Sequence, residues 1–401
     1  MNGLFLYVLF ATAVMVGCAG LPVTGTIGGQ TIETRVDSKV ARYFLANYLA
    51  DKHTDPVLDK RIDRVYQKSN GSLPNRQDLK KLSDDFSVDF AALYLADRIA
   101  RVPANRRFSA AFRQAYEYTR KAVSEGRMKV PGAAEYDVLF VPTYLYKRLT
   151  LTGADLAVPR AALQNVGFHC FFVETFDDGS IETNAEIVTA AIGDRATSGR
   201  RLIVISASKS GAEVALALTK LGPARTRHVA AWINAVGALQ GTPMVDDKLL
   251  PDLEFLVGKV NPAGGRKYGD YPEPTPLRIV QHPSYSACGQ LLRDSHNRKI
   301  SFFGRKGFFP LRKYGPNDGS LLLADMIFPG GLTLPRLGSD HMQMNNNLDI
   351  VTVALIMTVV DWLKSDDYIS PLPSNNLTRR TPERPQDSEN DVSANGLVSS
   401  P

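Results

Sequence analysis

The stretch LIVISASKSGAEVALAL, residues 202–218, decides the fold of this 401-residue chain. It opens with an apolar run that predicts a buried strand. Small and apolar residues then follow at helical spacing, so the chain must turn sharply between the two. Ser208 stands at that turn, with Ser206 and Ser210 two positions away on either side. A residue in a strained turn needs small neighbours, and the pattern therefore predicts a strand–turn–helix unit that exposes the Ser208 hydroxyl.

Two interpretations of Ser208 follow from this turn. In the first, the hydroxyl is a nucleophile, and the backbone N–H of Lys209 at the start of the helix stabilises developing negative charge. In the second, Ser208 only caps the helix, as serine often does. The local pattern leaves both interpretations open.

The segments around the turn alternate between strand and helix patterns over residues 134–366. Further buried strands are predicted from apolar runs at 137–141, 167–173 and 228–234. A helix is expected to begin within 180–184, and the apolar segment 348–363, too short to span a bilayer, predicts a buried helix. This alternation predicts an α/β domain with a mainly parallel central sheet.

Residues 35–130 show no strand pattern and carry apolar side chains at helical spacing. Asp37 and Ser38 are suited to cap the first helix. The apolar positions that repeat at this spacing include Val40, Phe44, Tyr48, Leu58, Ile62, Val65, Ala92, Leu95, Ile99, Phe108, Phe112 and Tyr116. We predict a helical subdomain that packs on, or caps, the α/β domain.

The first 18 residues predict export from a bacterial cell. The apolar run 4–16 is shorter than the roughly 20 residues that a membrane-spanning helix needs. The stretch MVGC, residues 15–18, resembles a bacterial lipobox, which implies that Cys18 carries acyl chains such as palmitate that anchor the protein to a membrane. Ala19, where an inner-membrane lipoprotein would have Asp, resembles the outer-membrane sorting pattern. A plain signal peptide with a chance cysteine is the alternative. Residues 19–34 are predicted to form a Gly/Thr-rich linker.

Composition and spacing argue against several other classes. The chain has 47 basic and 41 acidic residues, a formal charge of +6, and these are spread rather than clustered, so no nucleic-acid partner is predicted. Residues 370–401 are rich in Pro, Ser and Asn and predict a disordered tail. Cys170 and Cys288 suit neither a zinc site nor a disulfide framework, and either a bond between them or two separate thiols is possible. No metal or cofactor is predicted.

From about Val138 to Met342 the chain resembles the lipase-like α/β hydrolases. The run VPTY, residues 141–144, resembles their first oxyanion loop. The run SIETNA, residues 180–185, resembles the start of the helix before the nucleophile strand, and AWINAVGALQGTP, residues 231–243, is similar to the strand and turn after the nucleophile. The resemblance implies an α/β-hydrolase fold.

The resemblance also implies roles for individual residues. Ser208 takes the place of the nucleophile in the family's G-x-S-x-G elbow, where Ser206 and Ser210 replace the glycines. The oxyanion hole would be formed by the backbone N–H of Lys209 together with that of Thr143 or Tyr144.

The remaining members of a catalytic triad are expected in the order Ser, acid, His. The run PNDG, residues 316–319, resembles the family's acid-bearing loop and indicates Asp318. Beyond it only His341 remains as a histidine, before the C-terminal helix, where the family places its base. Other acids that could serve are Asp246, Asp247, Asp325 and Asp340.

The sequence therefore predicts a serine hydrolase that cleaves acyl esters, as a lipase or an esterase, anchored at the outer membrane through its lipid. An acyltransferase that uses the same residues is one alternative, and a catalytically inactive binding or scaffold lipoprotein is another. The segment 249–305 is expected to form a lid or a substrate-selecting insertion.

Overall fold

The computed structural model describes residues 20–69, 71–125, 128–245, 284–290, 301–328, 330–342 and 347–365. Several predictions lie outside these residues, namely the export segment 1–18 with Cys18, the acids Asp246 and Asp247, the tail 370–401 and most of the segment 249–305. No helix of the described part is long and apolar enough to cross a bilayer.

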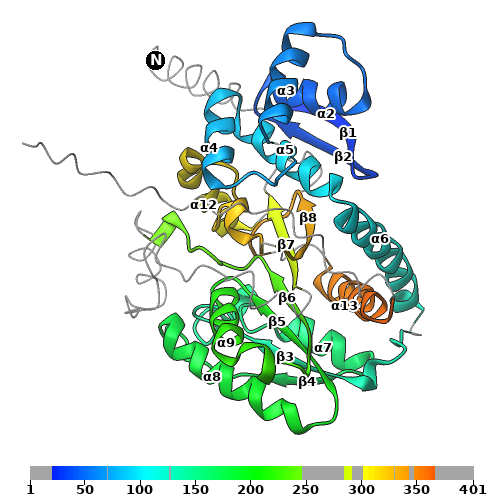
Figure 1. Ribbon diagram of the computed structural model, residues 1–401, viewed down its shortest axis with the longest axis vertical. Helices are drawn as coiled ribbons and strands as arrows, with labels where there is room; N and C mark the ends of the chain where they lie inside the picture. Colours follow the sequence, from blue (N-terminus) through cyan, green and yellow to red (C-terminus); the bar gives the residue numbers. More distant parts are fainter. Residues whose placement is uncertain are drawn as a thin grey trace, which may run out of the picture. The chain divides into compact units, whose positions relative to one another are not determined.

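A six-stranded sheet with the order β4-β3-β5-β6-β7-β8 lies at the centre (Figure 1). Its strands are β3 Tyr136–Val141, β4 His169–Phe172, β5 Arg201–Ala207, β6 Val229–Ala235, β7 Ser284–Gln290 and β8 Leu332–Leu337. All neighbouring strands are parallel. The central strands are buried along almost their whole length, as expected of a parallel sheet covered on both faces. Strands β3 to β6 confirm the four predicted strands.

Strands β7 and β8 are not predicted by the sequence patterns. β7 reads SYSACGQ, with few large apolar residues, and β8 reads LTLPRL, with Pro335 inside it. Their pairing defines them, since Ala287 of β7 lies in register between Ala235 of β6 and Leu334 of β8. The segment 249–305 therefore contributes a strand to the sheet, and the prediction that it is an insertion is wrong for residues 284–290.

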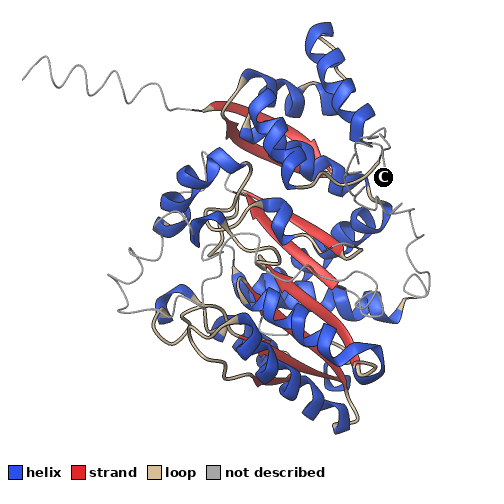
Figure 2. Ribbon diagram, turned by 60° about the vertical axis from the view of Figure 1, so that its left-hand side comes forward, coloured by secondary structure: helices blue, strands red, loops and turns tan. Residues whose placement is uncertain are grey.

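Helices cover both faces of the sheet (Figures 1 and 2). On one face α8, Ile181–Asp194, packs against α9, Ser210–Arg225, over apolar side chains of β3, β5 and β6. On the other face α13, Leu348–Lys364, packs between α6, Pro103–Ser124, and α7, Ala157–Asn165. Helix α8 begins at Ile181 and confirms the helix predicted to begin within 180–184, and α13 confirms the helix predicted over 348–363.

The N-terminal region is helical, as predicted. Before α6 its helices are α2 Lys39–Ala46, α3 Pro56–Ser69, α4 Arg76–Asp85 and α5 Val88–Arg101. Ser38 caps α2, because its Oγ accepts a hydrogen bond of 3.1 Å from the Ala41 N–H. Buried side chains of α5, including Phe90 and Leu93, belong to one apolar cluster with Ile181 and Met326 of the α/β domain. The helical region and the α/β domain thus share a hydrophobic core.

The prediction that residues 19–34 form a linker is wrong. Residues Leu21–Ile27 form β1 and residues Gln30–Val36 form β2, which pair as an antiparallel hairpin. Gly28 and Gly29 make the two-residue turn, both with positive φ, which glycine adopts without steric cost. The buried side chains Val23, Ile27, Ile32 and Val36 join the core of the N-terminal helices. Threonine and glycine between these residues obscured an alternating pattern that is typical of a half-buried strand.

The two cysteines beyond the export segment do not form a disulfide with each other. Cys170 in β4 is a free thiol, and burial raises its pKa to about 12. Cys288 is in β7, four strands away across the sheet, a separation of roughly 19 Å at the usual strand spacing. A disulfide needs Cα atoms within about 7 Å.

Candidate functional site

Ser208 sits in the sharp turn between β5 and α9. Its φ is +53°, in the left-handed region that residues other than glycine rarely adopt. Two backbone hydrogen bonds hold the turn, one to the end of β6 and one to the chain just after it. The Ser208 N–H donates to the Ala235 carbonyl at 3.2 Å, and the Ala238 N–H donates to the Ser208 carbonyl at 2.8 Å. The strained backbone is therefore fixed by the neighbouring strand, as a nucleophile elbow requires.

The serines on either side of the turn do more than stay small. The Ser206 Oγ accepts a hydrogen bond of 2.8 Å from the indole Nε1–H of Trp232. The Ser210 Oγ accepts one of 3.0 Å from the Ala207 N–H and lies 3.0 Å from the Val141 carbonyl of β3. Both serines are fully buried. These bonds connect the turn to β6 and β3, a role that the sequence pattern did not reveal.

Close packing explains the glycine that follows. A Cβ atom on Gly211 would lie 2.5 Å from the Asn234 Oδ1 and 2.9 Å from the Cα of Gly237. The start of α9 thus touches the chain that leaves β6 with no room for a side chain. The small-residue face predicted for this helix is confirmed here.

The structure brings Ser208, His341 and Asp318 together in one hydrogen-bonded chain. The His341 Nε2 lies 2.9 Å from the Ser208 Oγ, and its Nδ1 lies 2.8 Å from the Asp318 Oδ2. Because an ionised carboxylate can only accept, the Nδ1 carries the proton and donates to Asp318, which leaves the Nε2 of the neutral ring to accept from the serine hydroxyl. The side chains of His341 and Asp318 are 8% and 0% exposed.

Asp318 is held from both sides of its carboxylate. The Oδ1 accepts hydrogen bonds from the Ser320 N–H at 2.9 Å and from the Leu321 N–H at 2.7 Å. The Asp318 carbonyl also accepts from the His341 N–H at 2.9 Å. The loop that carries Asp318 and the loop after β8 are thereby joined, and the Oδ2 stays directed at the imidazole.

The pKa of His341 is raised above its ordinary value of 6.5. Burial acts to lower the pKa, but the charge of Asp318, its hydrogen bond and the charge of Asp340 outweigh burial and favour the protonated ring. The imidazole is therefore a better proton acceptor than a free histidine.

The other acids considered have different partners. The Asp325 Oδ1 pairs with the Arg76 Nε at 2.9 Å. The Asp340 Oδ2 accepts a hydrogen bond of 2.7 Å from the Ser301 N–H, ahead of α12, Phe302–Leu311. Asp246 and Asp247 lie outside the described residues. Among the acids of the described part, Asp318 is the one that bonds to His341.

The oxyanion donors are only partly as expected. Within the described chain no hydrogen bond engages the Lys209 N–H, which leaves it able to bind an oxyanion at the elbow. The Thr143 N–H donates to the Ala154 carbonyl at 3.0 Å, so Thr143 is not available as the second donor, which corrects that part of the prediction. Tyr144, the other candidate, lies in the loop after β3, beyond Pro142 and Thr143 and before Leu145, whose φ is in the left-handed region.

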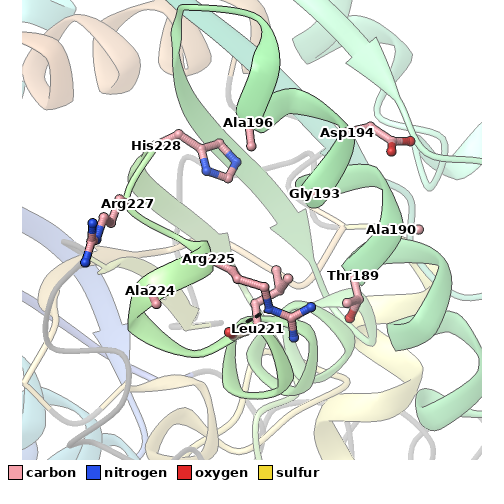
Figure 3. A pocket seen from close by; sticks show the side chains of 10 residues that line it. All are labelled: Thr189, Ala190, Gly193, Asp194, Ala196, Leu221, Ala224, Arg225, Arg227 and His228. Carbon is pink, nitrogen blue, oxygen red and sulfur yellow. Dashed lines mark hydrogen bonds between the residues drawn. The ribbon is translucent and has the colours of Figure 1, made fainter.

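An open pocket of about 530 Å³ lies elsewhere on the molecule (Figure 3). It is lined by residues of the carboxyl ends of α8 and α9 and by His228, which precedes β6. Because the strands are parallel, this position is at the opposite edge of the sheet from Ser208. The His228 Nε2 bonds to the Ile192 carbonyl at 2.9 Å, and the Arg225 Nη2 donates to the Lys220 carbonyl at 2.9 Å. These polar groups bond to backbone carbonyls near the ends of α8 and α9 and do not extend the site at Ser208.

The strand order and the placement of the three residues define the fold class. Ser208 follows β5 and His341 follows β8 at the carboxyl edge of a parallel sheet. Asp318 lies between β7 and β8, after α12, and meets His341 at the same edge. The chain has the α/β-hydrolase fold, with an additional helical region at its N-terminus.

Comparison with known proteins gives distant structural relatives only. No protein-family model and no curated protein matches the chain. Among solved structures, it is similar to the metagenomic carboxyl esterase MGS0156, with 19% identity over 59% of this chain and 77% of that one and a TM-score of 0.44. The mature Bacillus licheniformis lipase BlEst2 has 18% identity over 59% and 94%, with a TM-score of 0.42. Est1E from Butyrivibrio proteoclasticus has 13% identity over 60% and 92%, with a TM-score of 0.34.

Proposed function

We propose that the protein is a serine hydrolase that cleaves carboxylic acyl esters, with Ser208 as nucleophile, His341 as general base and Asp318 as the acid of the triad. The observation that carries the proposal is the chain of hydrogen bonds of 2.9 and 2.8 Å from the serine hydroxyl through the imidazole to the buried carboxylate. A serine hydroxyl is a weak nucleophile unless such a base takes its proton.

The first half-reaction forms an acyl-enzyme. The Ser208 Oγ attacks the ester carbonyl carbon while its proton passes to the His341 Nε2, and Asp318 stabilises the resulting imidazolium. The carbonyl oxygen becomes an oxyanion next to the N–H groups of Lys209 and Tyr144, each worth roughly 3 kcal/mol. The C–O bond to the leaving alcohol then breaks, and His341 returns the proton to that alcohol.

The second half-reaction restores the enzyme. Water attacks the acyl carbon and gives its proton to His341, the tetrahedral intermediate collapses, and the proton returns to the Ser208 Oγ as the acid leaves. If another alcohol takes the place of water, the same steps transfer the acyl group, so an acyltransferase is the related alternative.

Ester hydrolysis and serine labelling test the proposal together. We expect the wild type to hydrolyse p-nitrophenyl butyrate and to react covalently with a fluorophosphonate at Ser208, and the Ser208→Ala variant to do neither. Ser198→Ala is a matched control, since Ser198 lies in the turn before β5, at the other end of that strand from Ser208, and should not affect turnover. A folded wild type that neither hydrolyses esters nor labels would favour the inactive binding or scaffold lipoprotein.

We further propose that Cys18 carries the lipid that anchors the protein to the bacterial outer membrane. The proposal is supported by the MVGC stretch at residues 15–18 and by the marginal but additive membrane affinity of acyl chains. Labelled palmitate should be incorporated into the wild type and lost in Cys18→Ser, which should leave the membrane fraction. Labelling that persists in Cys18→Ser would contradict this anchor.

A further inference from the structure

A buried ion pair lies directly beside Ser208 and has no part in the steps above. The Lys209 Nζ contacts the Glu213 Oε1, one turn further along α9, and the two side chains are 6% and 2% exposed. Glu213 also accepts a hydrogen bond of 2.8 Å from the Asn184 Nδ2 of α8. Burial raises the pKa of Glu213, and the Lys209 charge and the hydrogen bonds from Lys209 and Asn184 offset this only in part.

Stability alone does not explain such a pair. Removing two charges from water costs about as much as their attraction returns, and apolar replacements of similar volume are often neutral or stabilising. The position of the pair is more informative. Lys209 provides the backbone N–H at the elbow, and its own side chain is fixed by Glu213 and lies with its Nζ 5.9 Å from the ring centre of Tyr144.

Asn184 extends the same contacts to the loop after β4. Its Oδ1 accepts a hydrogen bond of 3.1 Å from the Phe176 N–H, and its Nδ2 lies 3.0 Å from the Phe176 carbonyl. The next residue, Asp177, accepts hydrogen bonds from the Leu145 N–H at 2.8 Å and the Lys147 N–H at 2.7 Å. This loop therefore holds the turn that carries Tyr144.

A continuous set of contacts thus connects the two oxyanion donors. It runs from Lys209 through Glu213 and Asn184 to the loop at residues 176–177, and from there to the turn at residues 144–147. We propose that Glu213 and Asn184 are positioning residues, which fix the Lys209 and Tyr144 N–H groups relative to each other so that both reach the oxyanion. The inference rests on the proposed ester hydrolase function.

This role is tested by measuring kcat and KM, normalised to the concentration of reactive Ser208. For Glu213→Gln and Asn184→Ala we expect kcat for p-nitrophenyl butyrate to fall about 10- to 100-fold, less than the loss of a whole oxyanion donor. KM should stay within about twofold. Binding of a trifluoromethyl ketone, which adds to serine and forms a tetrahedral oxyanion, should weaken by the same factor as kcat. Titration of Ser208 with a fluorophosphonate gives the fraction of folded, reactive enzyme, so misfolding cannot imitate the effect.

Two further variants separate a positioning role of the ion pair from an effect on folding stability. Glu186→Gln removes an exposed ion pair with Lys220 between the same two helices and should change neither kcat nor ketone binding. The double variant Lys209→Met with Glu213→Leu keeps the backbone N–H and fills the space with apolar groups. It should fold at least as stably as the wild type but keep the reduced kcat.

The outcomes distinguish the two proposals. If the wild type is active and Ser208→Ala is not, but Glu213→Gln and Asn184→Ala keep full kcat and ketone affinity, the positioning role is overturned and the hydrolase stands. If the wild type neither turns over the ester nor labels at Ser208, the hydrolase proposal fails and the positioning role fails with it.

Discussion

His341 is the residue through which pH should control the proposed reaction. Only the neutral ring can accept the serine proton, and the raised pKa keeps the ring protonated to a higher pH than in free histidine. We therefore expect kcat/KM of the wild type to fall on the acid side with a midpoint above pH 6.5. A pH–rate profile between pH 5 and 9 measures this midpoint.

Substitution of Asp318 should lower kcat and shift the pH–rate profile. In Asp318→Asn the charge that raises the pKa of His341 is gone, so the acid limb should shift to lower pH, while kcat falls about 10⁴-fold because the ring loses its correct tautomer. Asp340→Asn is a graded control, since Asp340 contributes the smallest part of the rise and should shift the limb slightly with little loss of rate. An unchanged profile in Asp318→Asn would rule out this acid.

Gly211 should tolerate no larger residue. In Gly211→Ala the added methyl group would meet Asn234 and the backbone of Gly237, and such overpacking typically costs about 1–3 kcal/mol of unfolding free energy. Gly193→Ala in α8 is the matched control, because nothing lies within 4 Å of its added Cβ and alanine should stabilise the helix by roughly 0.5–1 kcal/mol. Urea unfolding compares the two. Equal midpoints would refute the tight contact.

Individual residues of the site differ in how far sequence could predict them. Ser208 is predicted from its local turn together with the resemblance to the hydrolases, and His341 from the chain order that this resemblance implies. The assignment of Asp318 over Asp325 and Asp340 depends on which carboxylate reaches the imidazole, a distance that no local pattern contains. The hydrogen bond from the Thr143 N–H to the Ala154 carbonyl and the contacts of Asn184 with Phe176 also depend on how the loops fold, which no local pattern predicts.

At the scale of helices and strands, long periodic patterns are sufficient to predict an element. Strands β3 to β6 and helices α8 and α13 have uninterrupted apolar runs or clear helical spacing, and each was predicted. Strand β7 could not be, because its polar and small residues form a strand only between β6 and β8. The β1–β2 hairpin was missed although Gly28-Gly29 is a recognised hairpin turn.

The hairpin should contribute measurably to stability. Ile32→Ala removes a buried side chain of β2 and should lower the unfolding free energy by about 2–5 kcal/mol. Thr31→Ala, on the exposed face of the same strand, should change it by less than about 0.5 kcal/mol. Thermal unfolding of both variants provides the comparison. If residues 30–36 were an unpacked linker, Ile32→Ala would also leave the unfolding free energy unchanged.

For the molecule as a whole, the shared core predicts one cooperative unfolding transition. Phe90 of α5 is fully buried in the cluster that also contains Ile181 and Met326. Phe90→Ala should cost about 3–5 kcal/mol and should shift the fluorescence transition of Trp232, in the central sheet, by the same amount as the circular dichroism transition. A Trp362→Phe background isolates the Trp232 signal.

The opposite result is equally clear. If the Trp232 transition stays in place while part of the helical signal melts earlier, the helical region folds independently. Val57→Ala on α3 is the control, since Val57 is 70% exposed and its loss should affect neither signal.

The buried hydroxyls at positions 206 and 210 have a consequence for how relatives of this chain are recognised. The elbow requires residues of small volume at these two positions. Serine is small enough, and its hydroxyl adds a hydrogen bond to Trp232 or to the end of β3. A search that insists on glycine on both sides of the nucleophile would pass over such chains. One that accepts any small residue there, and asks for a hydrogen-bonding partner opposite each serine, would retrieve them.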